Sequence, residues 1–154
     1  MTIPFVDGKA WKIDDHSTRE LVAVHAPTKS ELRVTLFTES DLMNRAKCEL
    51  RATELGYAPD LELDVIDQEV TSIPAGWDTK VLVASEAGKA GGPVRAHVFA
   101  FASFIRKCIV FHYATEVVAG DERSLSSRLA AVRLKTLEGL TMDTFGAVPR
   151  EKLP

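Results

Sequence analysis

The sequence has few cysteines, no excess of positive charge and no long apolar run. Its 154 residues include 19 Lys and Arg, 22 Asp and Glu and two cysteines, with a net charge of −3. A nucleic-acid surface would show a basic stripe, which these interspersed charges do not form. No apolar run approaches the roughly 18 residues of a membrane span. The first residues, MTIPFVDGKAW, lack the basic region and apolar stretch of a secretory signal. We therefore expect a cytoplasmic protein without nucleic-acid binding or membrane insertion.

Motifs for known chemistry are equally scarce. There is no nucleophile elbow, zinc-protease helix, paired CxxC or dinucleotide fingerprint. The segment Gly88–Gly92 lacks the first glycine and the Ser or Thr of a phosphate loop, and is interpreted as a flexible hairpin loop. Cys48 and Cys108 are expected to be reduced, buried thiols rather than a disulfide. The sequence predicts no cofactor, no metal site and no catalytic residue.

The apolar pattern predicts a single domain over residues 1–154, with an ordered core at about 5–145. The fraction of hydrophobic residues, 45%, suits one buried core. Alternation and turn signals predict two helices, at 40–55 and 124–142, and strands at 20–26, 31–38, 61–70, 79–85 and within 94–118. Residues 10–14 form a short strand or a turn. The order β-β-α-β-β-β-β-α predicts an α+β fold, an antiparallel sheet of about six strands with two helices.

The most informative segment is the hairpin predicted within 94–118, because both of its faces are apolar. With a turn at 103–106, one face carries Ala96, Val98, Ala100, Ala102, Ile109, Phe111 and Tyr113. The other face carries His97, Phe99, Phe101, Cys108, Val110 and His112. A surface hairpin would alternate apolar and polar side chains, so this one needs cover on both sides. The cover is the chain's own helices, a second subunit or a bound partner.

Two histidines of this hairpin are the strongest candidates for chemistry. The turn at 103–106 places His97 directly opposite His112, with Cβ atoms roughly 5 Å apart. Such a pair suits a metal site or a pH-sensitive contact, although no third ligand is indicated. The alternative is a polar rim on an apolar face. His112 and Glu116 lie four residues apart on one strand, roughly 13 Å, too far to share a metal ion.

Several segments together carry a resemblance to a known family. They are WKIDDHSTRELVAV (Trp11–Val24), LRVTLFTES (Leu32–Ser40), GGPVRAHVFAF (Gly91–Phe101), KCIVFHYAT (Lys107–Thr115) and LKTLEGLTMDTF (Leu134–Phe145). In this order they resemble the PsbP-like α/β/α sandwich, and within it the DcrB-related family. That family includes the effector-associated chaperones of bacterial type VI secretion. The chain departs from the pattern at the turn 103–106 and at Ala96 and His97.

The resemblance implies a non-enzymatic, homodimeric chaperone or adaptor that binds apolar segments of a secreted bacterial effector on a sheet face. On this hypothesis the partner-binding residues are Phe99, Phe101, Cys108 and Val110, with His97 and His112 at the edge. One alternative is an immunity protein that neutralises a toxin through acidic residues, here Asp60, Glu62, Asp64, Asp67 and Glu69. Another is a small lyase or isomerase that uses His97, His112 and Glu116.

Overall fold

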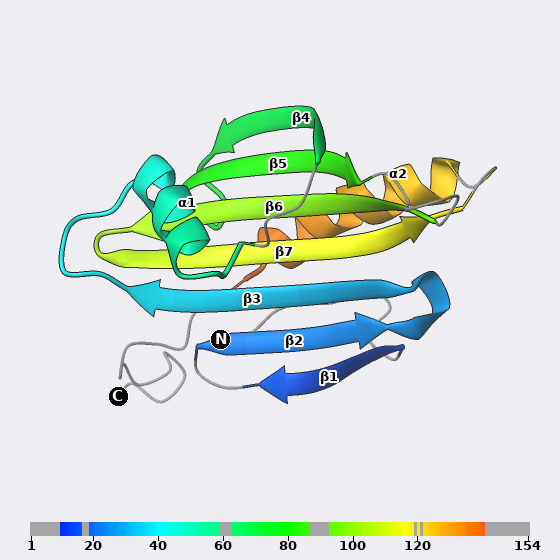
Figure 1. The fold of residues 1–154 in the computed structure, drawn as a ribbon, viewed down its shortest axis with the longest axis horizontal. Helices are drawn as coiled ribbons and strands as arrows, with labels where there is room; N and C mark the ends of the chain where they lie inside the picture. Colours follow the sequence, from blue (N-terminus) through cyan, green and yellow to red (C-terminus); the bar gives the residue numbers. More distant parts are fainter. Residues whose placement is uncertain are drawn as a thin grey trace.

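The computed structural model describes residues 10–16, 19–58, 63–86, 93–118, 120 and 122–140. It contains one seven-stranded antiparallel sheet with the strand order β1-β2-β3-β7-β6-β5-β4 (Figure 1). The strands are β1 (Trp11–His16), β2 (Glu20–His25), β3 (Ser30–Thr38), β4 (Asp64–Thr71), β5 (Asp78–Glu86), β6 (Val94–Phe104) and β7 (Lys107–Val117). The 3-10 turn η1 (Ala26–Thr28) joins β2 to β3.

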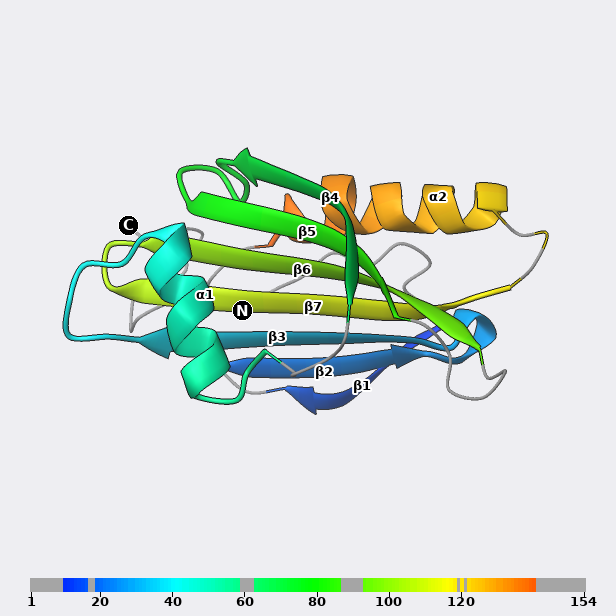
Figure 2. The same cartoon turned by 45° about the horizontal axis from the view of Figure 1, so that its top comes forward.

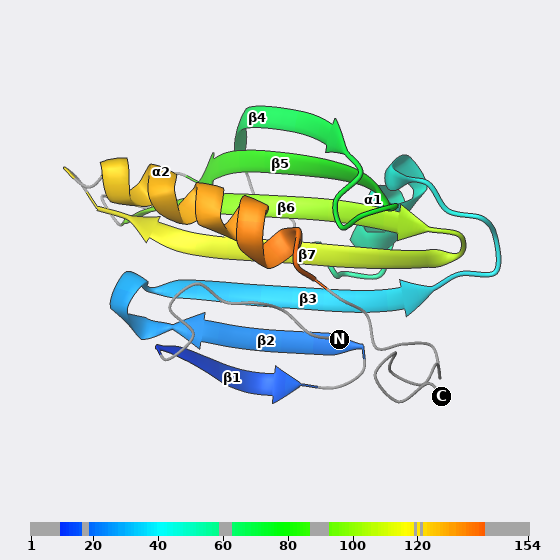
Figure 3. The same cartoon turned by 180° about the vertical axis from the view of Figure 1, so that it is seen from behind.

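The helices lie on opposite faces of this sheet. Helix α1 (Arg45–Glu54) crosses one face, and helix α2 (Glu122–Ala131) with the π-helical turn η3 (Val132–Leu137) covers the other (Figures 2 and 3). The predicted α+β class with two helices is confirmed. The sheet has one strand more than the expected order, because the segment that begins near Trp11 pairs with β2 as a strand rather than forming only a turn.

Two separate cores confirm that hairpin β6–β7 is buried on both faces by the chain's own helices. The core beneath α2 and η3 is the larger. Its buried members include Leu21, Leu32, Val34, Val98, Ile109, Phe111, Tyr113, Leu137 and Leu140. The core beneath α1 consists of Phe37, Cys48, Ala52, Phe99, Phe101, Cys108 and Val110. Alternate residues of each strand enter different cores, as the period of two requires.

The turn between β6 and β7 is tighter than predicted. Phe104 pairs with Lys107, so Ile105 and Arg106 alone form the turn, and the expected four-residue turn at 103–106 is wrong. Each residue of β7 therefore lies two positions from its expected partner: His97 is opposite Ala114, and Phe99 is opposite His112. A shift of two residues keeps every side chain on its predicted face. The predicted faces are thus confirmed, although the direct opposition of the histidines is not.

Helix α1 also differs from its prediction. It begins at Arg45 with Asn44 as its N-cap, rather than near Ser40, because the preceding segment bonds to the β6–β7 turn. The Glu39 N–H donates to the Arg106 carbonyl over 2.8 Å, and the Met43 N–H donates to the Ile105 carbonyl over 2.6 Å. The helix buries Cys48 and Ala52. Two leucines within the range predicted for this helix, Leu42 and Leu50, are 69% and 62% exposed.

The C-terminal helix is confirmed in position but not in form. The sequence predicts one helix at 124–142, whereas α2 gives way to the π-helical η3 at Val132. Within the predicted range, Val132, Thr136 and Leu140 are buried. Three other predictions fall outside the described residues: the hairpin loop at Gly88–Gly92, the acidic residues Asp60 and Glu62, and the ordered core's outer limits.

Candidate functional site

The six residues predicted to bind a partner lie on the sheet face that α1 crosses. Helix α1 buries the four apolar ones: Phe99, Phe101, Cys108 and Val110 are each no more than 4% exposed. His97 is also buried, and His112 is half-buried. Direct contact between a partner and the four apolar side chains would require α1 to move away. Their role in binding stays a prediction.

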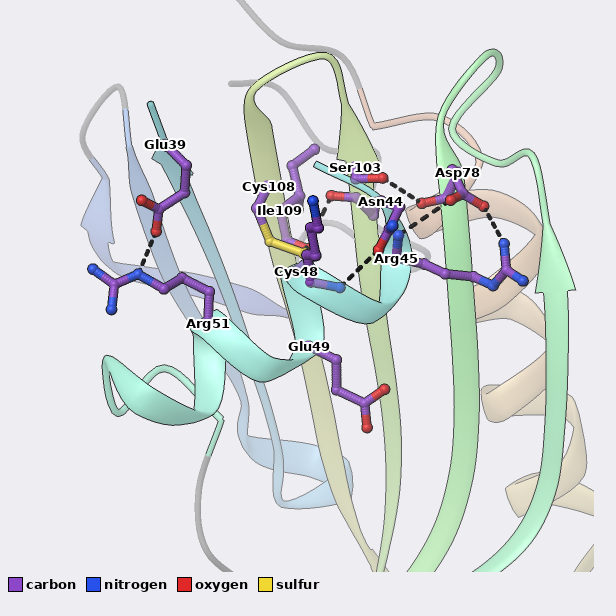
Figure 4. The surroundings of a disulfide bond; sticks show 12 residues. Glu39, Asn44, Arg45, Cys48, Glu49, Arg51, Asp78, Ser103, Cys108 and Ile109 are labelled. Atoms are coloured by element: carbon purple, nitrogen blue, oxygen red, sulfur yellow. Dashed lines mark hydrogen bonds and ion pairs between the residues drawn. A yellow bond between two sulfur atoms is a disulfide. The ribbon is translucent and has the colours of Figure 1, made fainter. Parts of the chain in front are cut away.

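A disulfide bond fixes α1 to this face. Cys48 of α1 and Cys108 of β7 are bonded, with their Cα atoms 5.6 Å apart (Figure 4). The prediction of two reduced thiols is therefore wrong. The predicted helix at 40–55 and the predicted hairpin within 94–118 correctly contain Cys48 and Cys108. That the helix lies over that strand, within the Cα spacing a disulfide needs, follows only from the fold.

Ion pairs fix the same helix from both sides. Arg45 contacts Asp78 of β5 over 2.9 Å, and Arg51 contacts Glu39 over 2.5 Å (Figure 4). Lys80 of β5 contacts Glu49 of α1 over 2.7 Å. The Arg45 backbone N–H, which donates to Asp78 over 3.1 Å, is the main reason that the pKa of this carboxyl is lowered. Because these pairs are only partly buried, they orient α1 more than they stabilise the fold.

Beyond the end of α1 the same face forms a polar groove of about 360 Å³, here called the histidine groove. Its described lining residues are Glu20, Glu31, Arg33, Thr35, Gly56, Tyr57, Glu86, Arg95, His97, His112 and Ala114. Gly56 and Tyr57 follow α1, and the other lining residues share a face because they occupy alternate positions of β2, β3, β5, β6 and β7. The face thus changes along β6 from the apolar Phe101 and Phe99 to the polar His97 and Arg95.

Four aromatic rings connect the core beneath α1 to this groove. Phe101 stacks on Phe99 with ring centroids 6.2 Å apart, and Phe99 stacks on His112 at 4.1 Å. His112 in turn stacks on His97 at 5.1 Å. All three interplanar angles are below 15°, at 4°, 7° and 14°. Offset stacking of this kind adds to the stabilisation from burial alone. The imidazoles are therefore held rigidly.

Hydrogen bonds order the two imidazoles. His97 Nε2 lies 3.1 Å from Glu86 Oε1, and His97 Nδ1 lies 2.8 Å from His112 Nε2. The carboxylate accepts from the His97 Nε2–H, so in the neutral ring Nδ1 accepts from the His112 Nε2–H. Burial lowers the pKa of His97, against an opposing effect of Glu86. Burial, with the nearby His97, Arg95 and Arg33, lowers the pKa of His112 to about 3.

The predicted pair is thus brought together, but its carboxylate is Glu86 rather than Glu116. Glu116 forms an ion pair with Lys29 over 3.2 Å. Sequence reasoning missed Glu86 and Arg95, although both continue the alternation that placed His97 on this face. Among the described residues, the Arg95 Nε atom is buried without a hydrogen-bond partner. A buried donor of this kind favours a ligand that supplies an acceptor.

The histidine groove provides hydrogen-bonding groups and charged side chains that can bind a ligand. Its His97–His112 pair is uncharged at neutral pH, and neither serine nor cysteine is among the described residues that line it. In the described part of the chain, no group of three or more His, Cys, Asp or Glu side chains is arranged to hold a metal ion. None of the described helices has the length and apolar character needed to cross a membrane.

Comparison with known proteins yields similarity at the level of structure. No protein-family model matches the chain, and no curated protein matches it. The Ran-binding protein Mog1p of Saccharomyces cerevisiae superposes with a TM-score of 0.51 at 9% identity, covering 77% of this chain and 74% of Mog1p. LpqN of Mycobacterium tuberculosis, involved in cell envelope biogenesis, gives 0.51 at 14% identity, covering 90% of this chain and 80% of LpqN.

A third structure, from Bacteroides thetaiotaomicron, has a TM-score of 0.42 at 6% identity, and the matched part covers 75% of this chain but only 38% of that protein. At identities this low, structural likeness shows the fold alone. None of the matches supports a link to the DcrB-related family or to secretion effectors. The predicted PsbP-like architecture is confirmed at the level of fold: the chain has a Mog1/PsbP-like α+β fold.

Proposed function

We propose that this chain is a non-enzymatic binding protein whose partner is another protein. The observation that carries the proposal is the surface formed by the outer side of α1 and the histidine groove. The similarity in fold to a Ran-binding protein agrees with such a role. In its narrower form the proposal is a homodimeric chaperone or adaptor for a secreted bacterial effector.

Exposed apolar side chains on α1 and on the segments that flank it support a protein partner. Leu42 and Leu50 are more than 60% exposed, and Leu55 and Tyr57 are 39% and 37% exposed. Apolar patches beside polar rims are typical of protein-binding surfaces. The disulfide and the ion pairs hold α1 firmly on the sheet, which lowers the entropy cost of presenting these side chains.

The histidine groove adds polar recognition next to this patch. Glu20, Glu31 and Glu86 give it carboxylates, and Arg33 and Arg95 give it cations. Arg33 is paired with Glu20 over 2.6 Å, whereas the buried Arg95 Nε lacks an acceptor among the described residues. We expect a partner carboxylate or backbone carbonyl to bind Arg95.

The disulfide indicates the cellular compartment in which the protein acts. Disulfides persist in oxidising compartments and are rare in the cytosol. The Cys48–Cys108 bond therefore favours an exported protein over the cytoplasmic location that we expected from the N-terminal residues. Acid quenching of the cells, alkylation of free thiols in the denatured chain, and then reduction and labelling with a second reagent distinguish the two. The disulfide of an exported chain is protected from the first reagent, and the reduced thiols of a cytosolic chain react with it.

Affinity purification from the cells that produce the protein, followed by titration of each identified partner against the purified chain, tests the proposal. We expect Leu50→Glu and Arg95→Glu to weaken binding at least tenfold. Leu134→Glu is the matched control, because Leu134 is equally exposed, at 63%, but lies on η3 across the sheet. A partner that binds all of these variants equally well would place its contacts elsewhere and contradict the proposal.

A second candidate function, toxin neutralisation, has one observation in its favour. Strand β4 is a sheet edge and is exposed over most of its length, with Val65, Ile66 and Val70 more than 50% exposed. It carries the acidic residues Asp64, Asp67 and Glu69, the last of which pairs with Arg133. An edge strand can add a strand of a partner. Loss of toxin binding in Asp64→Lys with Ile66→Lys, but not in Leu50→Glu, would favour this candidate.

A further inference from the structure

Strand β4 lies at the end of the sheet furthest from β1, and β5 pairs with it on one side (Figure 1). Its other side is an open edge. Val65, Ile66 and Val70 of this strand are 56%, 68% and 58% exposed. An edge strand carries a row of backbone N–H and C=O groups that can pair with a strand of another chain. Large apolar side chains beside such an edge indicate an interaction surface.

The pairing with β5 assigns the acidic side chains of β4 to the sheet face covered by α2 and η3, here called the α2 face. Glu69 is opposite Val81, a buried residue of the core beneath α2 and η3. Asp67 is opposite Val83, which packs against the same core. Because opposite residues of paired strands point to the same side, both carboxylates lie on the α2 face.

The side chains of β4 on the other face, the α1 face, are uncharged. Gln68 is opposite Leu82, which packs against the core beneath α1. Val70 lies two residues further along the strand and therefore on the same face. The bulge that follows Val65 shifts the alternation by one residue, so Val65 lies on this face too, opposite Ala84. The edge is thus acidic towards α2 and mainly apolar towards α1.

The α2 side of the edge has more carboxylates than its cation can balance. Arg133 of η3 contacts Glu69 and lies 4.0 Å from Asp67, whose side chain is still 60% exposed. Asp64, opposite Ser85, is also exposed and adds a third carboxylate on this side. Counted over these four charged residues, the α2 side of the edge is negative. Added cations in the neighbouring positions would therefore be attracted to it.

The same carboxylates oppose pairing of β4 with a second copy of itself. In an antiparallel pair centred on Gln68, Asp67 would lie opposite Glu69 of the second copy. In a pair centred on Asp67, that carboxylate would lie opposite its own equivalent. Like charges directly opposite each other destabilise a strand pair. The strand that fits this edge therefore belongs to a different chain and carries cations at these positions.

We infer that the β4 edge binds an extended segment of another protein in which Lys or Arg alternates with apolar residues. The cations would pair with the carboxylates on the α2 face, and the apolar side chains would lie beside Val65 and Val70 on the α1 face. Main-chain hydrogen bonds supply affinity in such strand addition, and the alternating side chains supply specificity. The inference rests on the proposed protein partner, and it names the chemistry of the segment that the second candidate function leaves open.

A fluorescein-labelled peptide of sequence KVKVKV tests the inference by fluorescence anisotropy. We expect saturable binding to the purified chain at low salt, with a Kd below about 1 mM. Two peptides are the controls: KKKVVV has the same composition without the alternation, and EVEVEV has the alternation with the opposite charge. Each should bind about tenfold more weakly, since only a cationic period of two places every cation on the acidic face.

A charge-reversed variant assigns the binding to β4. Asp67→Lys should weaken KVKVKV binding about fivefold and strengthen EVEVEV binding, because like charges would replace opposite ones across the new strand pair. Asp41→Lys makes the same change of charge at an exposed residue before α1 and should bind as the parent does. Circular dichroism confirms that each variant is folded. In the parent, bound KVKVKV should also slow hydrogen exchange of the β4 backbone amides, measured by NMR.

The inference is overturned by the absence of saturable binding, by equal binding of KKKVVV, or by an unchanged preference in Asp67→Lys. Protection of the β4 amides in the free chain that is lost on dilution would also overturn it, because a second copy would then occupy the edge. The peptide tests the edge alone, whereas Leu50→Glu and the partner purified from cells test the surface around α1. Failure of one proposal is therefore distinguishable from failure of the other.

Discussion

Two residues decide the chemistry of the histidine groove. His112 is stacked on Phe99 and hydrogen-bonded to His97, and both imidazoles are neutral at neutral pH because burial opposes their charged forms. A neutral pair suits recognition by hydrogen bonds. Charging it on acidification would bring two cations together beside Arg95.

This burial predicts an acid sensitivity. Because the pKa of His112 falls from about 6.5 to about 3 on folding, the unfolded chain binds more protons between these pH values. The contribution of His112 to stability is complete above pH 6.5 and is lost as the pH falls towards 3. We expect the free energy of unfolding of His112→Phe to depend less steeply on pH between 6 and 4, by up to about 1.4 kcal/mol per pH unit. Urea unfolding at a series of pH values measures this, and parallel pH profiles for the two proteins would contradict it.

A second residue-scale prediction concerns the turn between β6 and β7. Ile105 has a φ of 57°, in the left-handed region, which is unfavourable for a β-branched residue. Its side chain is 55% exposed, so its removal costs little packing. We expect Ile105→Gly to raise the free energy of unfolding by about 1 kcal/mol, as measured by chemical denaturation. Arg106→Gly, at the neighbouring position with ordinary φ, should lower it. An equal loss in both variants would show that no strain is relieved.

Among the secondary-structure elements, α1 determines which residues of its sheet face are buried and which are exposed. It is only ten residues long, and its two buried residues are small. Short helices are marginal by themselves, so its position depends on what anchors it. The anchors are the bond from Cys48 to Cys108, and the salt bridges to Asp78 and Lys80.

We predict that Cys48→Ala with Cys108→Ala lowers the free energy of unfolding by about 4 kcal/mol. The bond closes a loop of 60 residues, and loops of this length give about that value in the chain-entropy account. Equilibrium urea unfolding measures the change. The parent protein under strong reductant is the control and should approach the stability of the variant. If reductant leaves the stability of the parent unchanged, the bond contributes nothing and the prediction is wrong.

For the whole molecule, the two-sided cover of the sheet determines which surfaces are available to partners. Both faces of hairpin β6–β7 are buried within one chain, so a second subunit is not needed to cover the predicted apolar face. The described surfaces that we propose for a partner are α1 with its flanking segments, the histidine groove and the open edge at β4.

This arrangement predicts that Phe99→Glu with Phe101→Glu does not fold. Each phenylalanine is at most 4% exposed, and the loss of two core aromatics together with two buried charges exceeds the 5–15 kcal/mol that typical domains have. Circular dichroism and light scattering, with Leu50→Glu as a folded control, test it. A folded double variant with a smaller mass than the native protein would contradict it and make this face a subunit interface.

The candidate site was partly predictable, because alternation along β6 and β7 assigns each side chain to a face whatever the exact register. For this reason His97, Phe99 and His112 share the predicted face, although the predicted pairing of β6 with β7 is wrong by two residues. Glu86 and Arg95 follow the same alternation on β5 and β6. Both lie at strand ends next to the glycine-rich segment that joins these strands, where the sequence predicts a loop.

The sequence by itself determined the α+β class, the two apolar faces of the hairpin and the residue types available at each face, because these depend on local period and composition. Only the tertiary structure decided that Cys48 meets Cys108, that Glu86 rather than Glu116 reaches His97, and that α1 buries small residues and exposes Leu50. Each of these depends on how a helix and distant strands are placed against one another. Such contacts join residues far apart in the chain, and no local pattern encodes their distance.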